Sequence, residues 1–340
     1  MQAAPITVRK ITMKNINDIR NKRILYIATK NADYLRITQE LRILRENGNT
    51  VTEIVSPEKS YPKRLLYVWK ELFKAKMKNF DMSFIGFAPQ LVLPLFGWKL
   101  KKKPVAVDFF ISMYDTMCFD RKKFKPGSLI GRLLKRIDRR TLKYADMSVC
   151  DTKAHGRYFC EEFSYPQEKM SVLYLEADTS IYYPREMPKN KDFTVLYFGS
   201  VLPLQGVPVI LDAIELLENE KNLKFIFVGP LGDNNIRKGE KITEYIDWLS
   251  QEKLAEKIAQ ADLCLAGHFH GEIMKAKRTI PGKAYIYRAM NKPMILGDND
   301  ATHELYSESD EGIYFVEMGN PRKLADLILS IKEKHNEKNS

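Results

Sequence analysis

The sequence has few cysteines, and none of them stand in a spacing that binds a metal or builds a disulfide framework. Its four cysteines are Cys118, Cys150, Cys160 and Cys264, and they form no C-x-x-C pair. Structural zinc sites and small secreted domains use closely and regularly spaced cysteines. We therefore expect neither kind of site, and a reducing compartment such as the cytosol fits this composition.

Long hydrophobic runs are also missing. The most apolar stretch, residues 91–98 (LVLPLFGW), is much shorter than the roughly 20 residues that a membrane-spanning helix needs. The N-terminus has no apolar signal core, so we expect neither a cleaved leader nor an integral membrane protein. Internal repeats and low-complexity tracts are absent as well, which excludes repeat arrays and collagen-like folds. Any contact with a membrane is expected at its surface.

Charge is plentiful and unevenly distributed. The chain of 340 residues contains 55 Lys and Arg against 43 Asp and Glu, a net charge of +12. Residues 1–175 hold 34 basic and 17 acidic side chains, whereas residues 176–340 hold 21 and 26. The first half therefore favours an anionic partner and the second half does not. With 44% apolar and 29% charged residues, the chain is typical of a globular protein of two domains.

The pattern of apolar residues predicts strands and helices in alternation. In the first half we expect strands at 23–28, 50–55, 82–86, 105–109 and 147–150, with helices at 34–46, 62–80 and 128–144. In the second half we expect strands at 195–198, 224–228, 263–265, 293–295 and 313–316, with helices at 207–218, 253–259, 283–290 and 321–334. Because parallel strands need long crossovers, this alternation predicts an α/β protein with two Rossmann-like parallel sheets.

A polar stretch with several prolines divides the two halves. We predict an N-terminal extension at 1–20, a first domain at 21–180, a linker at 181–192, a second domain at 193–335 and a tail at 336–340. Ligands of open α/β sheets bind beyond the carboxyl ends of the strands. Two such domains are therefore expected to face a central cleft.

Two segments of the second half carry a family resemblance. Residues 195–207 (VLYFGSVLPLQGV) contain a strand, a glycine turn and a helix start, and they resemble the motif "Y-G-x-x-x-P-L-x-G". Residues 275–295 (KAKRTIPGKAYIYRAMNKPMI) are similar in order and spacing to "K-A-x-R-x-I-P-N-K-x-Y-E-A-L-A-M-G-K-P-V-I". Both motifs are typical of GT-B glycosyltransferases of family 4. Weaker similarity extends the resemblance over roughly residues 22–333, including residues 247–249, which resemble the strand that borders the base in this family.

The resemblance implies a GT-B fold whose second domain binds a nucleotide-sugar donor. The donor-binding candidates are Gly199, Ser200, Gln205, Gly206, Trp248, Leu249, Arg278, Lys283, Ile286 and Glu304. Ser200 and Gln205 stand where most members have Arg and Lys for the diphosphate, so Arg278 and Lys283 are expected to supply the positive charge, unless both are surface cations. Ile286 stands where a carboxylate usually holds the ribose hydroxyls, and an isoleucine cannot accept those hydrogen bonds.

The catalytic candidates are carboxylates. Asp108 and Asp115 follow a strand of the first domain and are candidates for holding sugar or acceptor hydroxyls, and Glu272 is a candidate near the donor sugar. Members of the family retain the anomeric configuration, usually explained by front-face attack, so the paired carboxylates of a hydrolase are not needed. His268 and His270 have no third ligand beside them, and catalysis in the family is metal-independent. We therefore expect no metal and no cofactor.

The two predicted helices at 62–80 and 128–144 are basic and amphipathic. The membrane-facing candidates are Lys63, Arg64, Trp69, Lys70, Lys74, Arg132, Lys135, Arg136 and Arg139. Such helices are typical of peripheral membrane contact, although an ordinary helix that packs on the sheet has a similar pattern. We expect association with an anionic membrane surface on the cytoplasmic side.

These features predict a retaining hexosyltransferase. It would move a hexose from a nucleotide sugar to a lipid-linked or polysaccharide-precursor acceptor in the synthesis of a cell-surface glycan such as a capsule. One alternative is a degenerate transferase-like binding protein, motivated by Ser200, Gln205 and Ile286. A sugar-nucleotide epimerase has no feature in its favour. Nucleic-acid binding is motivated by charge alone and lacks a recognised module, so we expect no such partner.

Overall fold

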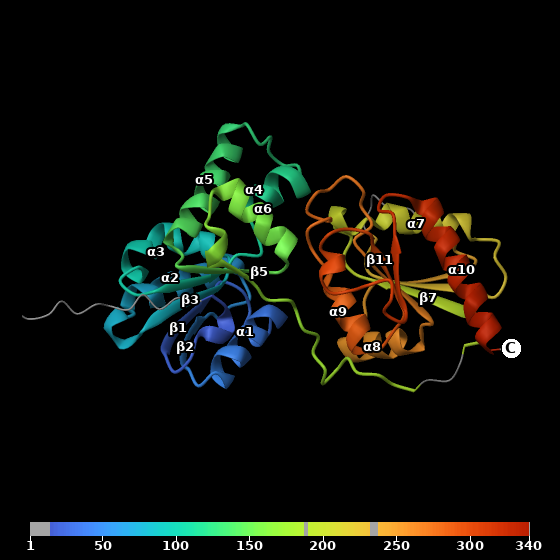
Figure 1. Ribbon diagram of the computed structural model, residues 1–340, viewed down its shortest axis with the longest axis horizontal. Helices are drawn as coiled ribbons and strands as arrows, with labels where there is room; N and C mark the ends of the chain where they lie inside the picture. The colour runs from blue at the N-terminus through green and yellow to red at the C-terminus, as the bar shows by residue number, and fades with distance from the viewer. Residues whose placement is uncertain (1–13, 187–189, 232–236, 340) are drawn as a thin grey trace, which may run out of the picture. The chain divides into compact units, whose positions relative to one another are not determined.

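The computed structural model describes residues 14–186, 190–231 and 237–339, which form two units (Figure 1). Unit 1 contains the described residues up to Phe110 together with Arg136–Cys150 and Gly156–Leu173. Unit 2 contains Ile111–Lys135, Asp151–His155 and the described residues from Tyr174 onwards. Residues 1–13 of the predicted extension, 187–189 of the linker and 340 of the tail lie outside the described residues.

Unit 1 is built on a six-stranded parallel sheet with the order β2-β1-β3-β4-β5-β6. The strands are β1 (Arg23–Ala28), β2 (Thr50–Val55), β3 (Met82–Phe87), β4 (Val105–Asp108), β5 (Met147–Cys150) and β6 (Met170–Val172). Strands β1, β3, β4 and β5 are buried along almost their whole length. This is the expected result of apolar runs that are covered on both faces of a parallel sheet.

The helices of unit 1 differ from the prediction in three places, one of which is the helix at Lys153–Phe163 that was not predicted. Unit 1 contains α1 (Leu35–Glu46), α2 (Tyr61–Lys74) and α3 (Leu93–Leu100). Two further helices, α5 (Leu129–Tyr144) and α6 (Lys153–Phe163), have residues in both units. The short turns are η1 (Ile16–Asp18), η2 (Met77–Asn79), η3 (Pro89–Leu91) and η5 (Gln167–Lys169). The helix predicted at 62–80 ends at Lys74, because Ala75 leaves helical geometry with ψ 131°. Helix α3 was not predicted, since Pro94 and Gly97 interrupt its apolar pattern.

Unit 2 contains a second six-stranded parallel sheet with the order β12-β11-β10-β7-β8-β9. Its strands are β7 (Phe193–Phe198), β8 (Leu223–Val228), β9 (Thr243–Ile246), β10 (Leu263–Gly267), β11 (Met294–Gly297) and β12 (Ile313–Val316). Strand β9 was missed because it is an edge strand without a strongly apolar face. Residues 247–249, which resemble a strand, follow its end and belong to no strand.

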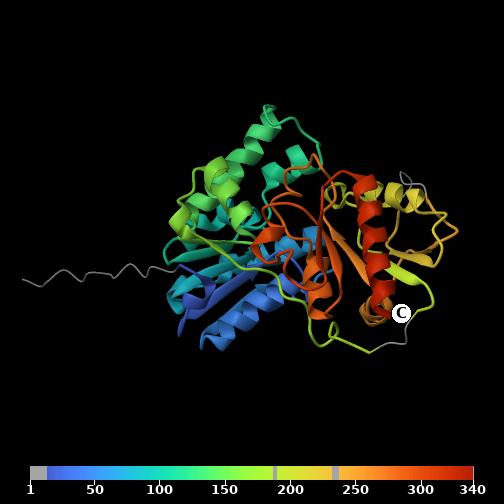
Figure 2. The same cartoon turned by 45° about the vertical axis from the view of Figure 1, so that its right-hand side comes forward.

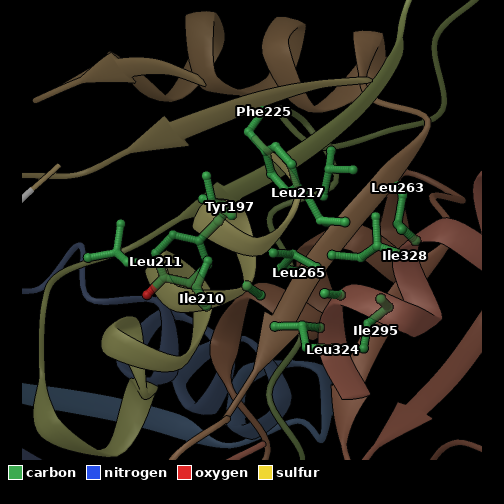
Figure 3. Close-up of a cluster of buried hydrophobic side chains, with 14 of the residues drawn as sticks. Tyr197, Ile210, Leu211, Leu217, Phe225, Leu263, Leu265, Ile295, Leu324 and Ile328 are labelled. Carbon is green, nitrogen blue, oxygen red and sulfur yellow. The ribbon is translucent and has the colours of Figure 1, made fainter. Parts of the chain in front are cut away.

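Helices cover both faces of this second sheet, as Figure 2 shows. They are α7 (Val207–Leu216), α8 (Gln251–Gln260), α9 (Gly282–Ala289) and α10 (Pro321–Asn339), with short turns α4 (Met113–Asp115), η4 (Thr116–Asp120), η6 (Pro203–Gln205) and η7 (Thr302–Glu304). On one face Tyr197 of β7 and Leu265 of β10 pack with Ile210 of α7 and Leu324 of α10 (Figure 3). On the other face Leu196 packs with side chains of α8 and α9. Consecutive residues of a strand thus pack into the hydrophobic clusters on opposite faces of the sheet.

The predicted α/β architecture with two parallel sheets is confirmed, while the shared cleft stays a prediction. Cys118, Cys150, Cys160 and Cys264 are all free thiols. Among the described residues, no helix combines the length and the apolar character needed to cross a bilayer.

Candidate functional site

Two glycines follow the neighbouring strands β7 and β8 at the carboxyl edge of the unit 2 sheet. Gly199 and Gly229 have φ values of 149° and 146°, a region that favours glycine. A Cβ atom on Gly229 would overlap the carbonyl oxygen of Gly199, and one on Gly199 would lie 3.2 Å from the Nζ atom of Lys283. Glycine at these two positions therefore leaves the backbone open beside a lysine ammonium group.

Lys283 lies in the first turn of α9 and is 5% exposed. Its Nζ atom donates a hydrogen bond of 2.6 Å to Oε1 of Gln205 and lies 4.4 Å from the ring centre of Tyr197. Burial lowers the pKa of Lys283 to about 7, because the low-dielectric surroundings disfavour the charged form. Since Gln205 is a neutral amide, an anionic ligand that reaches this ammonium would stabilise its charge. The amide groups at the start of the same helix favour negative charge as well.

The turn that carries Gln205 rests on the backbone that follows β10. The amide of Phe269 donates to the carbonyl oxygen of Gln205 at 3.1 Å. Gly206 has a φ of 70°, and a Cβ atom there would lie 2.5 Å from the amide nitrogen of His270. The close approach of two backbones explains why this turn requires glycine.

Two ion pairs join residues 275–278 to residues 115–120, all within unit 2. Arg278 Nη2 lies 3.0 Å from Oδ1 of Asp115, and Lys275 Nζ lies 3.8 Å from Oδ2 of Asp120. Lys275 also donates to Oγ1 of Thr116 at 3.2 Å. The structure therefore brings together Arg278 and Asp115, which the sequence placed in different domains and in different roles.

The two histidines near β10 have separate environments. His268 is 4% exposed, and burial together with Lys283 and Lys275 lowers its pKa to about 3, so the ring is neutral at pH 7. Nδ1 of His270 accepts hydrogen bonds from the backbone amides of Glu272 and Ile273 at 3.1 and 3.2 Å. No group of three His, Cys, Asp or Glu residues suited to a metal occurs in the described parts of the chain.

The predicted carboxylates Glu272 and Glu304 differ in their surroundings. Glu272 is exposed to solvent. Glu304 accepts hydrogen bonds of 2.7 Å from the amides of both Lys153 and Ala154 and one of 2.8 Å from the hydroxyl of Tyr174. It thereby caps the N-terminus of α6, where a negative charge is favourable. The donor-binding role of Glu304 stays a prediction, and its oxygens already have partners.

The other predicted donor residues differ in their exposure. Ile286 and Leu249 are half-buried against the core between the sheet and α9. Trp248 is 77% exposed, and Ser200 is exposed as well. Ile286 lies three residues after Lys283 on α9, so the two residues are neighbours on one face of the helix.

Asp108 belongs to unit 1 and is completely buried. Nε and Nη2 of Arg36 donate to its two oxygens at 2.8 and 2.9 Å, so the carboxylate is held in a bidentate ion pair. Burial, followed by the charge of Asp108, raises the pKa of the neighbouring Glu40. The catalytic role of Asp108 stays a prediction, and its geometry is that of a buried ion pair.

Most of the predicted membrane-facing cations lie on the surface. Lys63, Lys70, Lys74, Arg132, Arg136 and Arg139 are exposed. Arg64 is 5% exposed instead, because its guanidinium donates to the carbonyl oxygens of Glu58 and Lys59. Trp69 is half-buried and donates to the carbonyl oxygen of Leu91, while Lys135 is half-buried beside the ring of Tyr114.

Large apolar side chains accompany these cations on α2 and α3. Leu66 and Phe73 of α2 are 62% and 76% exposed, and Leu95 and Trp98 of α3 are 52% and 64% exposed. The two helices are joined by Lys99, whose Nζ atom donates to the carbonyl oxygen of Phe73 at 2.7 Å. The sequence identified Trp69 as the aromatic contact of this surface, and the structure exposes Trp98.

Comparison with known proteins agrees with this fold. Residues 192–334 match the family model described as glycosyl transferases group 1. The structure of HepE from Anabaena in complex with UDP superimposes with a TM-score of 0.63 at 13% identity, covering 92% of this chain and 90% of HepE. The chain is a glycosyltransferase of the GT-B fold. No curated protein sequence matches it.

Two further GT-B structures resemble this glycosyltransferase at low identity. Sucrose-phosphate synthase from Thermosynechococcus elongatus has a TM-score of 0.62 at 12% identity, with 91% of this chain and 89% of that protein covered. The catalytic domain of starch synthase IV from Arabidopsis thaliana, bound to ADP and acarbose, has a TM-score of 0.62 at 10% identity, with 93% and 92% covered.

Sequence reasoning missed several residues that the structure brings next to the predicted candidates. Lys275 opens the motif that contains Arg278 and Lys283, so the motif was a usable signal for it. Asp120 and Thr116 lie more than 150 positions away from Lys275 in the sequence, and no local pattern connects them.

Proposed function

We propose that this glycosyltransferase transfers a hexose, with retention of the anomeric configuration, from a nucleotide-sugar donor to a lipid-linked or polysaccharide-precursor acceptor in cell-surface glycan synthesis. The observation that carries the proposal is the buried ammonium of Lys283 beside Gly199, within the segment that matches the group 1 family model. HepE is known in complexes with UDP and with UDP-glucose, which supports a nucleotide-sugar donor here.

The donor diphosphate would occupy the space beside Lys283 and the first turn of α9. There the ammonium and the backbone amides can stabilise the negative charge that develops on the leaving phosphate. A phosphate oxygen of the leaving group can then take the proton of the attacking hydroxyl. In this mechanism no side chain has to act as a strong base, and none of the steps uses a metal ion.

A lipid-linked acceptor is favoured by the surface of α2 and α3. Exposed Phe73 and Trp98 alternate there with exposed lysines such as Lys70 and Lys74. Apolar side chains that enter an interface, together with cations that attract anionic headgroups, are the features of a peripheral membrane protein. We therefore propose that the enzyme works at the cytoplasmic face of a membrane.

The second candidate is a binding protein that has lost transferase activity. It is favoured by Ile286, which offers no hydrogen-bond acceptor, and by Glu304, whose oxygens already cap α6. Such a protein would have lost standard donor-site residues and would transfer no sugar.

One experiment separates the two candidates. The purified protein is incubated with nucleotide sugars of the five common bases and with lipid-pyrophosphate saccharides, while nucleoside diphosphate affinity is measured by calorimetry. Sugar transfer that is lost in Lys283→Ala, with an unchanged melting temperature, supports the transferase. The absence of turnover with every donor, in a folded protein, contradicts the transferase. Nucleotide affinity that is lost in Lys283→Ala contradicts the degenerate alternative.

A further inference from the structure

A second polar site lies in unit 2 where residues 115–120 meet residues 275–278. The chain passes here through η4, a π-helical turn closed by a hydrogen bond of 2.8 Å from the amide of Arg121 to the carbonyl oxygen of Thr116. Asp115 precedes this turn and Asp120 ends it, and each forms an ion pair with a cation of residues 275–278. π turns are rare and are frequent at functional sites.

Each of these aspartates uses one oxygen in an ion pair. Oδ1 of Asp115 accepts from Arg278 at 3.0 Å, and Oδ2 of Asp120 lies 3.8 Å from Nζ of Lys275. Asp115 is 1% exposed and Asp120 is 7% exposed. The remaining oxygens, Oδ2 of Asp115 and Oδ1 of Asp120, are buried and accept no hydrogen bond from any described residue.

Two buried carboxylate oxygens without donors are unusual, since a buried polar atom without a partner carries its full desolvation cost. An oxygen of a carboxylate that is paired with a cation can only accept a hydrogen bond. The two ion pairs are neutral as a group, which removes the attraction for a charged ligand. A ligand that fits these two oxygens is therefore uncharged and donates several hydrogen bonds.

We propose that Asp115 and Asp120 together bind hydroxyl groups of a sugar, with Arg278 and Lys275 holding the two carboxylates in position. The proposal rests on the proposed function, which supplies a sugar as substrate, and it adds Asp120 and Lys275 to the site. It also divides the cations into two sets. Lys283 has a neutral partner and serves the diphosphate, whereas Arg278 and Lys275 are neutralised and serve the sugar.

The sugar can be the hexose of the donor or the terminal sugar of the acceptor, and two measurements distinguish these sources. Calorimetry compares nucleoside diphosphates with their hexose-linked forms, which isolates the contribution of the donor sugar. Steady-state kinetics with the active donor and acceptor gives the KM of each substrate. A hydrogen bond to a charged group is worth enough that Asp120→Asn should weaken the affected constant about tenfold.

Asp115→Asn should have the same effect, and affinity for the nucleoside diphosphate alone should change less than about twofold in both variants. The matched control is Asp326→Asn, an exposed acid of α10, which should change nothing. The double variant Asp120→Asn with Lys275→Gln restores a neutral pair without a carboxylate. If Asp120 were only structural, this double variant would recover affinity, whereas the proposal expects the loss to persist.

A third measurement is independent of the nucleotide. Free glucose, galactose, mannose and N-acetylglucosamine are titrated at millimolar concentration, and NMR shifts of Asp115 and Asp120 are followed in the full chain. Shifts that saturate in the wild type and vanish in Asp120→Asn support the site. If no sugar shifts these signals, and neither substrate constant responds to the variants, the inference is wrong. If no nucleoside diphosphate binds but free hexoses do, the proposed function fails and the sugar site stands.

Discussion

The ammonium of Lys283 donates its hydrogen bond to the side-chain oxygen of Gln205, 78 residues earlier in the sequence, at 2.6 Å. The partner is neutral, and burial has lowered the pKa of the lysine to about 7. The protonation of this side chain should therefore control how strongly the carboxyl edge of the unit 2 sheet attracts an anionic ligand near neutral pH.

Nucleoside diphosphate affinity should fall as the pH rises from 7.5 to 9. The nucleotide is fully ionised over this range, while Lys283 loses its proton above a pKa of about 7, so affinity should decrease by up to about tenfold per pH unit. In Lys283→Arg the guanidinium stays charged, and the profile should be flat. Calorimetry at several pH values measures both curves, and a wild-type affinity independent of pH would contradict the assignment.

The same lysine should affect the stability of the ligand-free protein in the opposite direction. Its pKa is about 7 when folded and roughly 10.4 when unfolded, so the unfolded chain binds more protons between these values. The contribution of Lys283 to the free energy of unfolding should therefore rise with pH across this window. Urea unfolding of the wild type and of Lys283→Met at pH 7 and pH 9 isolates this contribution, and an equal pH response in both proteins would refute it.

Ile286→Glu should strengthen the binding of ribonucleoside diphosphates about tenfold if the ribose lies over this part of α9. The new carboxylate would accept the ribose hydroxyls that an isoleucine cannot bind. Ile286→Leu keeps the surface apolar and should leave affinity unchanged. Titration of UDP and TDP tests the position further, because deoxyribose offers one hydroxyl fewer. Equal affinities in all three proteins would place the ribose elsewhere.

Membrane binding should depend on both the apolar and the basic side chains of α2 and α3. Phe73→Ser combined with Trp98→Ser removes two exposed aromatic rings and should reduce liposome binding more than tenfold. Reversal of Lys70 and Lys74 to Glu should reduce binding to anionic liposomes by a similar factor, since each cation is worth about 1 kcal/mol. The matched control Lys253→Glu, on α8, should have no effect.

Salt provides the second criterion for this surface. Binding to anionic liposomes should weaken as the ionic strength rises, while the part due to the aromatic rings should persist. Sedimentation of the full chain with anionic and with zwitterionic vesicles measures both parts. If the wild type does not bind anionic vesicles at low salt, the excess of basic residues in the first half does not serve membrane binding.

Arg36→Met should destabilise unit 1 by about 3–5 kcal/mol, because it leaves the buried carboxylate of Asp108 without its bidentate partner. Asp108→Asn tests the catalytic prediction for that residue. A loss of turnover with an unchanged free energy of unfolding would support a catalytic role. A loss of stability with turnover preserved in the folded fraction would identify a structural ion pair.

The sequence was sufficient for the elements that have strong apolar patterns and clear ends. Strands such as β1 and β2 begin and end at the predicted residues, because runs of apolar or β-branched residues bounded by turn residues define them. Strand β9 was missed, since Thr243 and Glu244 are polar and the strand lies at the sheet edge. Helix α3 was missed because Pro94 and Gly97 lower its helix propensity, while its packing in the fold stabilises it.

The site was less accessible than the fold. The motif that contains Arg278 and Lys283 pointed to cations near a ligand, yet it could not show that Asp115 neutralises one of them and Gln205 pairs with the other. These pairings join residues that are 163 and 78 positions apart. Distances of this kind follow from topology, which a local pattern does not encode. The burial of Asp108 likewise depends on the topology of the fold, which brings Arg36 next to it.

The hydrogen bond between Gln205 and Phe269 connects the surroundings of Lys283 to the segment that follows β10. The side-chain oxygen of Gln205 accepts from Lys283, while its backbone carbonyl oxygen accepts from the amide of Phe269. A ligand that displaces this side chain from the ammonium would disturb the turn at residues 203–206. The hydrogen bond from the Phe269 amide would then be the first contact to respond. The hydrogen-exchange rate of the Phe269 amide should therefore change when a ligand binds beside Lys283.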